Sequence, residues 1–320
     1  NISQTDPFFN AMEWGLCGLH DNGDPLDPKL KCHGCNAEEA WKISNSAASI
    51  IVAVIDSGIR YQDGKLKNNI WLNLAPTHDD LHGWNAYANS GDPMDNCGHG
   101  TLCADVIGMT FDPFNSICGV ARKIQLMACK ISDEHNCSVT SDEVVGIDYA
   151  HDHGAKILNY TRNNSAYSQA CFDAMDRARS TGAIVVVAAG NDNSNNDVDL
   201  CYPSNEALDN MVTVAAMNKT EGIAAFSNYG AKTVHLAAPG DFATKYGDYS
   251  SLLSDTSIAA SFTSGALALM MERSPNESYK ALINTLLTHT DPLPALEGKT
   301  ISGGCLNIGK ALGAYNTSIK

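Results

Sequence analysis

Short apolar runs that alternate with helical patterns constrain the fold of this 320-residue chain more than any other feature. The apolar runs cover residues 50–55, 156–160, 183–189, 211–216 and 233–237. Helical patterns cover residues 99–108, 140–153, 171–181, 257–271 and 277–288. Strands that are apolar along their whole length are typical of parallel sheets buried on both faces. The sequence therefore predicts an α/β fold of three layers, with a mostly parallel sheet covered by helices on both faces.

Local signals mark two helix ends and two surface regions. Thr140 and Glu143 have the spacing of a capping box at the start of the second helix, and Gly182 is placed to end the third. Residues 16–40 and 73–98 are rich in Gly, Asp, Asn and Pro, which predicts ordered surface loops or insertions.

The charge of the chain excludes two classes of partner. It carries 36 acidic and 21 basic residues, a formal net charge of -15, and shows no basic cluster. Such a chain repels nucleic acid and anionic membrane surfaces. No apolar run reaches the roughly 20 residues that a membrane span requires. We therefore expect no nucleic-acid partner and no membrane span.

The cysteine content favours the secretory route, because structural disulfides are rare in the cytosol. The chain has 11 cysteines, including the pair Cys32 and Cys35, which we interpret as disulfide partners. An odd count leaves at least one cysteine that is free or paired with another chain. Glycosylation sequons begin at Asn1, Asn136, Asn163, Asn218, Asn276 and Asn316, and a further one at Asn159 is expected to be buried. We predict a secreted protein or one in the lumen of a secretory organelle, whose signal or pro-segment lies outside this sequence.

Three polar side chains lie where predicted strands end and helices begin. Asp56 ends the first apolar run, His99 lies between two glycines before a helix, and Ser257 opens the longest apolar helix. Taken singly, each has a commoner structural interpretation, as a turn former, a structural histidine or an ordinary N-cap. Together they follow the Asp, His, Ser order of the subtilisin catalytic triad. Asn191, which follows a buried strand, is placed to donate to an oxyanion.

These residues belong to an ordered series of motifs by which the chain resembles the subtilase family over about residues 50–312. The motifs are Ile51–Ile59, His99–Ala104, Gly190–Asn191, Tyr202–Ser204, Phe226–Gly230, Ala238–Gly240 and Thr256–Ala260. Four further segments are similar to those of the apicomplexan parasite subtilisins: Asp6–Phe9, Trp14, Gly83–Asn85 and Asp92–Asp95. The resemblance implies one subtilisin-like catalytic domain over residues 1–320, with 1–49 as an N-terminal extension packed on it. It also places Cys103, as an unpaired thiol, beneath His99.

The resemblance further implies a secreted serine endopeptidase that works through an acyl-enzyme. Ser257 would attack the peptide carbonyl, His99 would accept and return its proton, and Asp56 would fix the imidazole. Asn191 and the Ser257 backbone N–H would bind the oxyanion. The implied substrate-binding residues are Thr161, Arg162, Asn163, Ala189 and Gly190. A cleaved inhibitory pro-segment is the other implied partner.

The chain departs from the family pattern at three places. Asp255 replaces the usual glycine two residues before the nucleophile, and a negative charge there would oppose oxyanion formation. Ser261 replaces a proline, which keeps a backbone N–H. Thr161–Asn164 replaces Ser-Leu-Gly-Gly at the substrate edge, where two glycines are lost. A pseudoprotease that keeps the triad but binds without cleaving is therefore the alternative, and the intact triad favours activity.

The resemblance also implies a structural calcium ion. Asp6, Asp112 and Asn115 supply oxygen donors suited to a hard cation, whereas Lys65 stands where a further ligand is common. A zinc hydrolase is disfavoured because neither His151 with His153 nor His33 with its neighbouring cysteines completes a ligand set. A dinucleotide-binding enzyme would need a glycine-rich turn after its first strand, and residues 56–59 do not form one.

Overall fold

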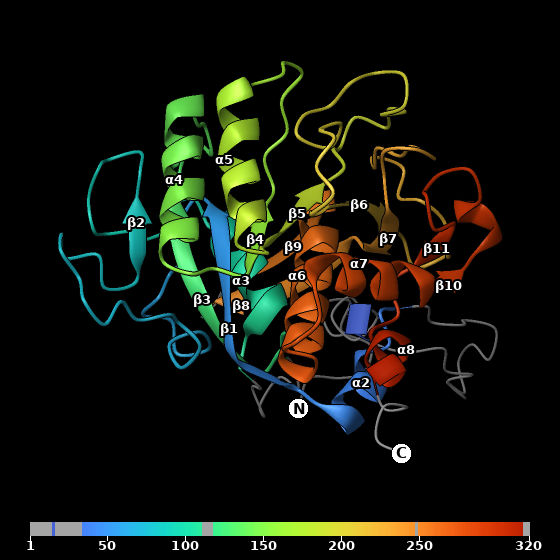
Figure 1. The fold of residues 1–320 in the computed structure, drawn as a ribbon, viewed down its shortest axis with the longest axis horizontal. Coiled ribbons are helices and arrows are strands. Elements are labelled where there is room, and N and C mark those ends of the chain that lie inside the picture. Colours follow the sequence, from blue (N-terminus) through green and yellow to red (C-terminus); the bar gives the residue numbers. More distant parts are fainter. Residues whose placement is uncertain (1–14, 17–33, 111–117, 247–248, 316–320) are drawn as a thin grey trace.

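The fold is built on one large sheet, seen in a computed structural model that describes residues 15–16, 34–110, 118–246 and 249–315 (Figure 1). The sheet has nine strands in the order β10-β11-β7-β6-β5-β4-β1-β3-β2. The strands are β1 (Ser46–Asp56), β2 (Gly83–Asn85), β3 (Lys123–Lys130), β4 (Ile157–Tyr160), β5 (Ile184–Ala188), β6 (Met211–Met217), β7 (Leu236–Pro239), β10 (Asp291–Pro292) and β11 (Gly304–Cys305). Every pairing is parallel except that of β10 with β11. The predicted mostly parallel sheet is confirmed.

Both faces of the sheet are buried, as the apolar runs predicted. Along β1, Val52 and Val54 point into one core cluster, whereas Ala53 and Ile55 point into the other. The helices are α2 (Ala37–Ile43), α3 (His99–Gly108), α4 (Thr140–Asp152), α5 (Gln169–Ser180), α6 (Thr256–Arg273), α7 (Tyr279–Thr288) and α8 (Ile308–Gly313). Residues of α3 and α6 share the first cluster, and those of α4 and α5, which lie side by side in Figure 1, share the second. The three predicted layers are therefore present.

Several strands went beyond the sequence prediction, among them the short strands β2, β10 and β11, and two further cases are informative. β3 lies between β1 and the edge strand β2, and only its four residues 126–129 are continuously apolar, between Gln125 and Lys130. The other is the antiparallel hairpin of β8 (Asp241–Tyr246) and β9 (Tyr249–Ser254), which forms its own two-stranded sheet. This hairpin lies directly before α6 in the chain, so it delivers the backbone to Ser257.

The predicted capping box at the start of α4 is wrong. Val139 is the N-cap, and no side chain caps this end of the helix. Glu143 is buried instead, where its carboxylate accepts hydrogen bonds from Ser138 Oγ at 2.7 Å and Tyr160 Oη at 3.0 Å. Glu143 therefore binds Tyr160 on β4 in place of capping the start of α4.

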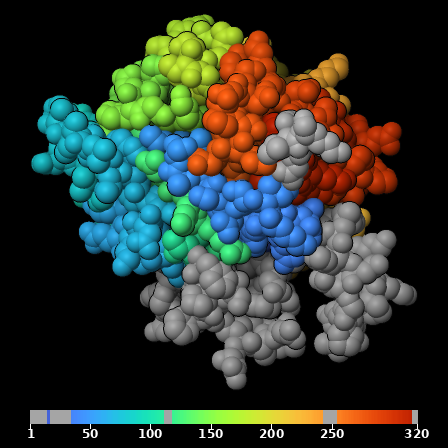
Figure 2. All heavy atoms as spheres, turned by 60° about the horizontal axis from the view of Figure 1, so that its bottom comes forward, coloured from blue at the N-terminus to red at the C-terminus, as the bar shows by residue number. Residues whose placement is uncertain are grey.

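The described part of the N-terminal extension packs against the C-terminal end of the chain. Asn36, just before α2, donates to Asn307 Oδ1 at 3.0 Å, and Trp41 on α2 donates to the Val120 carbonyl at 2.8 Å. Figure 2 shows the blue N-terminal segment against orange and red C-terminal residues. Residues 46–49 are part of β1 itself, so the extension is shorter than the predicted 1–49.

Two sequence expectations concern the surroundings of the chain. No helix among the described residues is long and apolar enough to cross a membrane. The thiols of Cys97, Cys103, Cys118, Cys129, Cys137, Cys171, Cys201 and Cys305 are unbridged. The disulfide prediction finds no support among these eight, many of which are buried in the apolar core. Cys17 and Cys32 lie outside the described residues, so the pairing of Cys32 or Cys35 stays a prediction.

Candidate active site

Asp56 and His99 form a closely bonded pair at the carboxyl end of β1. His99 Nδ1 lies 2.8 Å from both carboxylate oxygens of Asp56, whose side chain is fully buried. An ionised carboxylate can only accept, so Nδ1 carries the donated proton. Thr161 Oγ1 and the Ser57 N–H also donate to this carboxylate, each at 2.6 Å. The imidazole is thereby held in one tautomer with Nε2 free to exchange a proton.

The electrostatics of this pair follow from burial and mutual attraction. Burial by itself raises the pKa of Asp56, but the His99 charge and the hydrogen bonds outweigh it and lower that pKa to about 2. Burial lowers the pKa of His99, but the charge of Asp56, with smaller contributions from Asp255 and Asp95, raises it to about 9. The mutual attraction therefore favours the ionised carboxylate and makes His99 easier to protonate than a free imidazole; in its neutral form, with the proton on Nδ1, Nε2 can accept a proton.

Backbone geometry explains why His99 reaches Asp56. His99 is the first residue of α3, and Gly100 lets the helix approach β1 closely, because an added Cβ would lie 2.3 Å from the Gly58 carbonyl oxygen. Asp95 holds the loop before the helix: it accepts from Ser57 Oγ at 2.9 Å, the Gly98 N–H at 2.8 Å and the Thr101 hydroxyl. The position of His99 is fixed from both sides.

Cys103 lies one turn further along α3, beneath the catalytic pair, as predicted. Its sulfur and the ligand atoms of Asp56 and His99 lie within 4.8 Å of one another. Burial raises the pKa of the Cys103 thiol well above its usual value. Cys103 is therefore a buried, neutral and unbridged thiol, which agrees with its prediction as a free thiol.

The opposite wall of the site comes from the end of β5. Gly190 has φ 111°, a left-handed conformation that favours glycine, and an added Cβ would lie 2.4 Å from Asn228 Nδ2. Asn191 follows, and its Oδ1 accepts from the Thr256 N–H at 3.0 Å and the Thr256 hydroxyl at 2.9 Å. Since the oxygen is fixed by Thr256, the Asn191 amide N–H group points toward the start of α6.

Ser257 lies in the first turn of α6, with Asp255 as the N-cap. Asp255 Oδ1 accepts from the Ser257 N–H at 2.8 Å, the Ser257 hydroxyl at 2.8 Å and Asn191 Nδ2 at 2.9 Å. A hydroxyl has one proton, so Ser257 cannot at the same time donate to His99. Asn191 and Ser257 are thus joined through Asp255, whose negative charge also acts on His99.

The predicted substrate edge follows β4. Thr161 donates directly to Asp56, so it orients the Asp56 carboxylate, a contact that the sequence did not indicate. Arg162 Nη1 donates to the Asn136 carbonyl at 2.5 Å, and the Asn163 amide, oriented to donate, lies 3.0 Å from the Ala188 carbonyl oxygen. These two side chains therefore bind the backbone of neighbouring segments, at Asn136 and at the end of β5. Ala189 and Gly190 lie opposite them, after β5, as expected.

The predicted calcium ligands Asp6, Asp112 and Asn115 lie outside the described residues. Within the described ranges, the one cluster with metal-ligand spacing is Asp56, His99 and Cys103. Its nitrogen and sulfur atoms do not suit calcium, which prefers an all-oxygen shell. Among the described residues, the Thr110 N–H donates to the Lys65 carbonyl at 2.9 Å.

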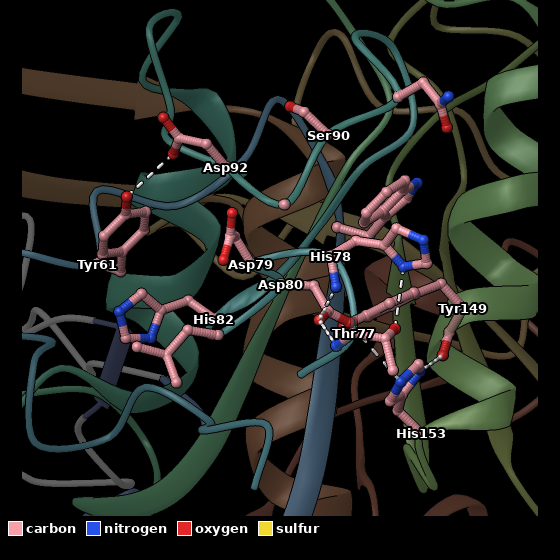
Figure 3. A pocket seen from close by; sticks show the side chains of 14 residues that line it. Tyr61, Thr77, His78, Asp79, Asp80, His82, Ser90, Asp92, Tyr149 and His153 are labelled. Carbon is pink, nitrogen blue, oxygen red and sulfur yellow. Dashed lines mark hydrogen bonds and ion pairs between the residues drawn. The ribbon is translucent and has the colours of Figure 1, made fainter. Parts of the chain in front are cut away.

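A cavity of about 990 Å³ lies outside this site, between the loop 77–92 and the end of α4 (Figure 3). Tyr61 Oη donates to Asp92 at 2.9 Å on one side, and Tyr149 Oη donates to the buried Asp80 at 2.8 Å on the other. None of the four predicted catalytic residues lines this cavity. It is formed by the Gly- and Asp-rich region that the sequence marked as an ordered loop.

Sequence reasoning missed two residues that build the site, Asp95 and Thr161 as an orienting group. Asp95 lies three residues before Gly98, a spacing at which a carboxylate accepts from a following turn, and this was the available signal. The contact of Thr161 with Asp56 spans 105 positions, so no local pattern could reveal it.

Comparison with known proteins agrees with this geometry. The subtilase family profile matches residues 47–305, which is most of the chain and close to the span expected from the motifs. The chain therefore belongs to the subtilase family.

The chain is similar to named serine proteases of this family. It is 30% identical over 302 residues to subtilisin-like protease 1 of Plasmodium falciparum, covering 84% of this chain and 44% of that protein. It is 26% identical over 284 residues to thermitase of Thermoactinomyces vulgaris, covering 88% and 90%. It is 28% identical to the thermophilic serine proteinase of Bacillus sp. (strain AK1), covering 74% and 56%. The chain thus spans less than half of the Plasmodium relative, and the similarity supports the apicomplexan resemblance.

Proposed function

We propose that this chain is the catalytic domain of a serine endopeptidase with Ser257 as nucleophile. Two observations support the proposal: the Asp56–His99 pair at the carboxyl end of β1, and the hydrogen bonds that join Asn191, just after β5, and Ser257 on α6 through Asp255, whose charge acts on His99. In a parallel sheet these ends form one edge, where loops and helix N-termini present reactive groups.

The chemistry follows from the geometry. Ser257 Oγ bonds to the peptide carbonyl carbon while its proton passes to His99 Nε2, and the carbonyl electron pair moves onto the oxygen. The Ser257 N–H and Asn191 Nδ2 donate to that oxyanion. His99 then gives its proton to the leaving amine, which leaves an acyl-enzyme for water to hydrolyse. Asp56 stabilises the imidazolium, and Thr161 and the Ser57 N–H keep its carboxylate in place.

Several wider features of the protein belong to this proposal. The substrate is a protein or peptide that lies along the edge after β4. We infer a secretory location with glycosylation from the sequons, with disulfide bonding limited to Cys17, Cys32 and Cys35, and a zymogen with a cleaved pro-segment from the family. Calcium would be held by Asp6, Asp112 and Asn115, as a structural ion that fixes surface loops. Calcium removal with EDTA should lower the Tm, and an unchanged Tm with no calcium by elemental analysis would contradict that site.

A pseudoprotease is the second candidate, because Asp255 occupies hydrogen bonds that catalysis requires. In that case the domain binds a partner or pro-segment along the same edge without cleaving it. The intact triad favours the enzyme.

Fluorophosphonate labelling tests the two candidates. The reagent forms a bond between Ser257 Oγ and phosphorus as fluoride leaves, and the serine proton passes to His99. We expect one adduct on Ser257, located by intact mass and peptide mapping, and none in Ser257→Ala. A folded chain that takes up no label, even in variants at Asp255, would favour the pseudoprotease.

A further inference from the structure

Asp255 makes an unusual set of contacts beside the nucleophile. A single oxygen, Oδ1, accepts three hydrogen bonds at 2.8–2.9 Å, from the Ser257 N–H, the Ser257 hydroxyl and Asn191 Nδ2. Two of these donors are the pair to which the proposed function assigns the oxyanion. A carboxylate oxygen resembles that oxyanion in charge and in its capacity to accept several hydrogen bonds.

We propose that the Asp255 carboxylate is an internal occupant of the oxyanion hole, which blocks the resting domain until a substrate displaces it. This inference rests on the proposed function, since it concerns the same nucleophile and the same two donors. It adds to that function a built-in inhibitor that restricts the enzyme to substrates able to compete with the chain's own side chain.

The contact opposes catalysis in two separate ways. The donors that should stabilise the tetrahedral intermediate are already satisfied, so a substrate carbonyl gains less by entering the hole. In addition, the Ser257 proton points to Asp255 and away from His99, so the nucleophile is not activated. The remaining negative charge of Asp255 would also repel the oxyanion as it forms.

Other contacts explain why the Asp255 carboxylate occupies this position and how it can move out of the oxyanion hole. Asp255 caps α6, an 18-residue helix whose N-terminus attracts negative charge. Its backbone is extended, with φ -160°, and its N–H donates to the Gly240 carbonyl at 2.9 Å. The residue is only partly buried, unlike the next residues of the helix, so side-chain rotation alone can move the carboxylate toward solvent.

The test compares the labelling rate of the wild-type chain with that of three variants, under pseudo-first-order conditions and after removal of any pro-segment. Asp255→Gly removes the occupant, and we expect labelling at Ser257 to be about 10²-fold faster, the size of effect that one oxyanion donor has on catalysis. Asp255→Asn keeps a helix cap but removes the charge, and we expect about a 10-fold gain. Asp192→Asn removes a neighbouring charge outside the hole and should change the rate less than about threefold.

The outcomes separate this inference from the proposed function. Equal rates for wild type, Asp255→Gly and Asp255→Asn, all with the adduct on Ser257, would overturn the block and leave the protease intact. An equal gain in Asp192→Asn would also overturn it, because general charge removal would then suffice. If no folded variant forms an adduct on Ser257, the proposed function itself fails. If Asp255→Gly does not fold, Asp255→Asn decides alone. A labelling rate equal to that of the wild type overturns the block, and a gain of about 10-fold supports it.

Discussion

The two halves of the candidate active site are equally well bonded but differ in what the bonds achieve. In the first half, the Asp56 carboxylate accepts from His99, Thr161 and Ser57, and these bonds orient the imidazole toward proton transfer. In the second half, three donors converge on Asp255, and these bonds occupy the groups that should receive the substrate.

This difference shows that satisfied hydrogen bonds indicate order and not catalytic readiness. An oxyanion hole works because its donors are preorganised but unoccupied until charge develops on the substrate. The Asp56–His99 half needs its partners filled, whereas the Ser257–Asn191 half needs them empty. One carboxylate in the wrong half therefore converts an intact set of catalytic residues into a blocked one.

The largest expected effect breaks the first half. In the Asp255→Gly background, Asp56→Asn should lower kcat by about 10⁴-fold, because the imidazole loses both its tautomer and its counter-charge. The measurement is peptide hydrolysis at saturating substrate, with Thr161→Val as a milder change at the same carboxylate. A loss under tenfold for Asp56→Asn would show that His99 does not depend on Asp56.

The next effect compares Asn191 in two backgrounds. With Asp255→Gly, Asn191→Ala should cost about 10²- to 10³-fold in kcat, because a working oxyanion donor is lost. In the wild-type chain the same substitution should cost much less, since that donor is already bound to Asp255. A double-mutant cycle on kcat/KM measures this coupling. Additive losses would mean that Asp255 does not occupy Asn191 in solution.

The pH profile should connect the two halves. Activity requires neutral His99, whose pKa is raised to about 9 by Asp56 and, to a smaller extent, by Asp255 and Asp95 after the opposing effect of burial. The kcat/KM profile should therefore rise with pH, with its midpoint near pH 9 and its plateau above that. Asp255→Asn should move this limb to lower pH, because one contributing negative charge is gone. An unmoved limb would contradict the electrostatic link, and Asp192→Asn is the matched control.

The smallest expected effect concerns stability. Asp255→Gly weakens the N-cap of α6 and should destabilise the chain by about a few tenths of a kcal/mol, whereas Asp255→Asn should be nearly neutral because Asn caps equally well. Thermal or urea unfolding at constant pH measures both. If Asp255→Gly were more stable than wild type, repulsion at Asp255 would outweigh its capping role.

Particular residues show how far the sequence could predict this molecule. The bounds of α3 were predicted from His99 to Gly108, and the strands β1, β4, β5 and β6 within a few residues, because their apolar runs are continuous. β3 was not predicted because two polar residues, Lys123 and Gln125, interrupt its apolar pattern. Glu143 was assigned to a local cap but binds Tyr160, 17 positions away, because burial with a tertiary partner outweighed a single surface hydrogen bond.

By itself, the sequence determined the alternating elements of the fold, the identity and order of Asp56, His99, Asn191 and Ser257, and the presence of a negative charge two residues before the nucleophile. Periodicity and motif order are local properties, so they can be read along the chain. Only the tertiary structure decided that Asn191, 64 positions from Asp255, donates to the same carboxylate oxygen as Ser257. The physical reason is that an oxyanion hole exists only where groups from β5 and α6 converge, so whether it is open or filled depends on distances that no sequence pattern specifies.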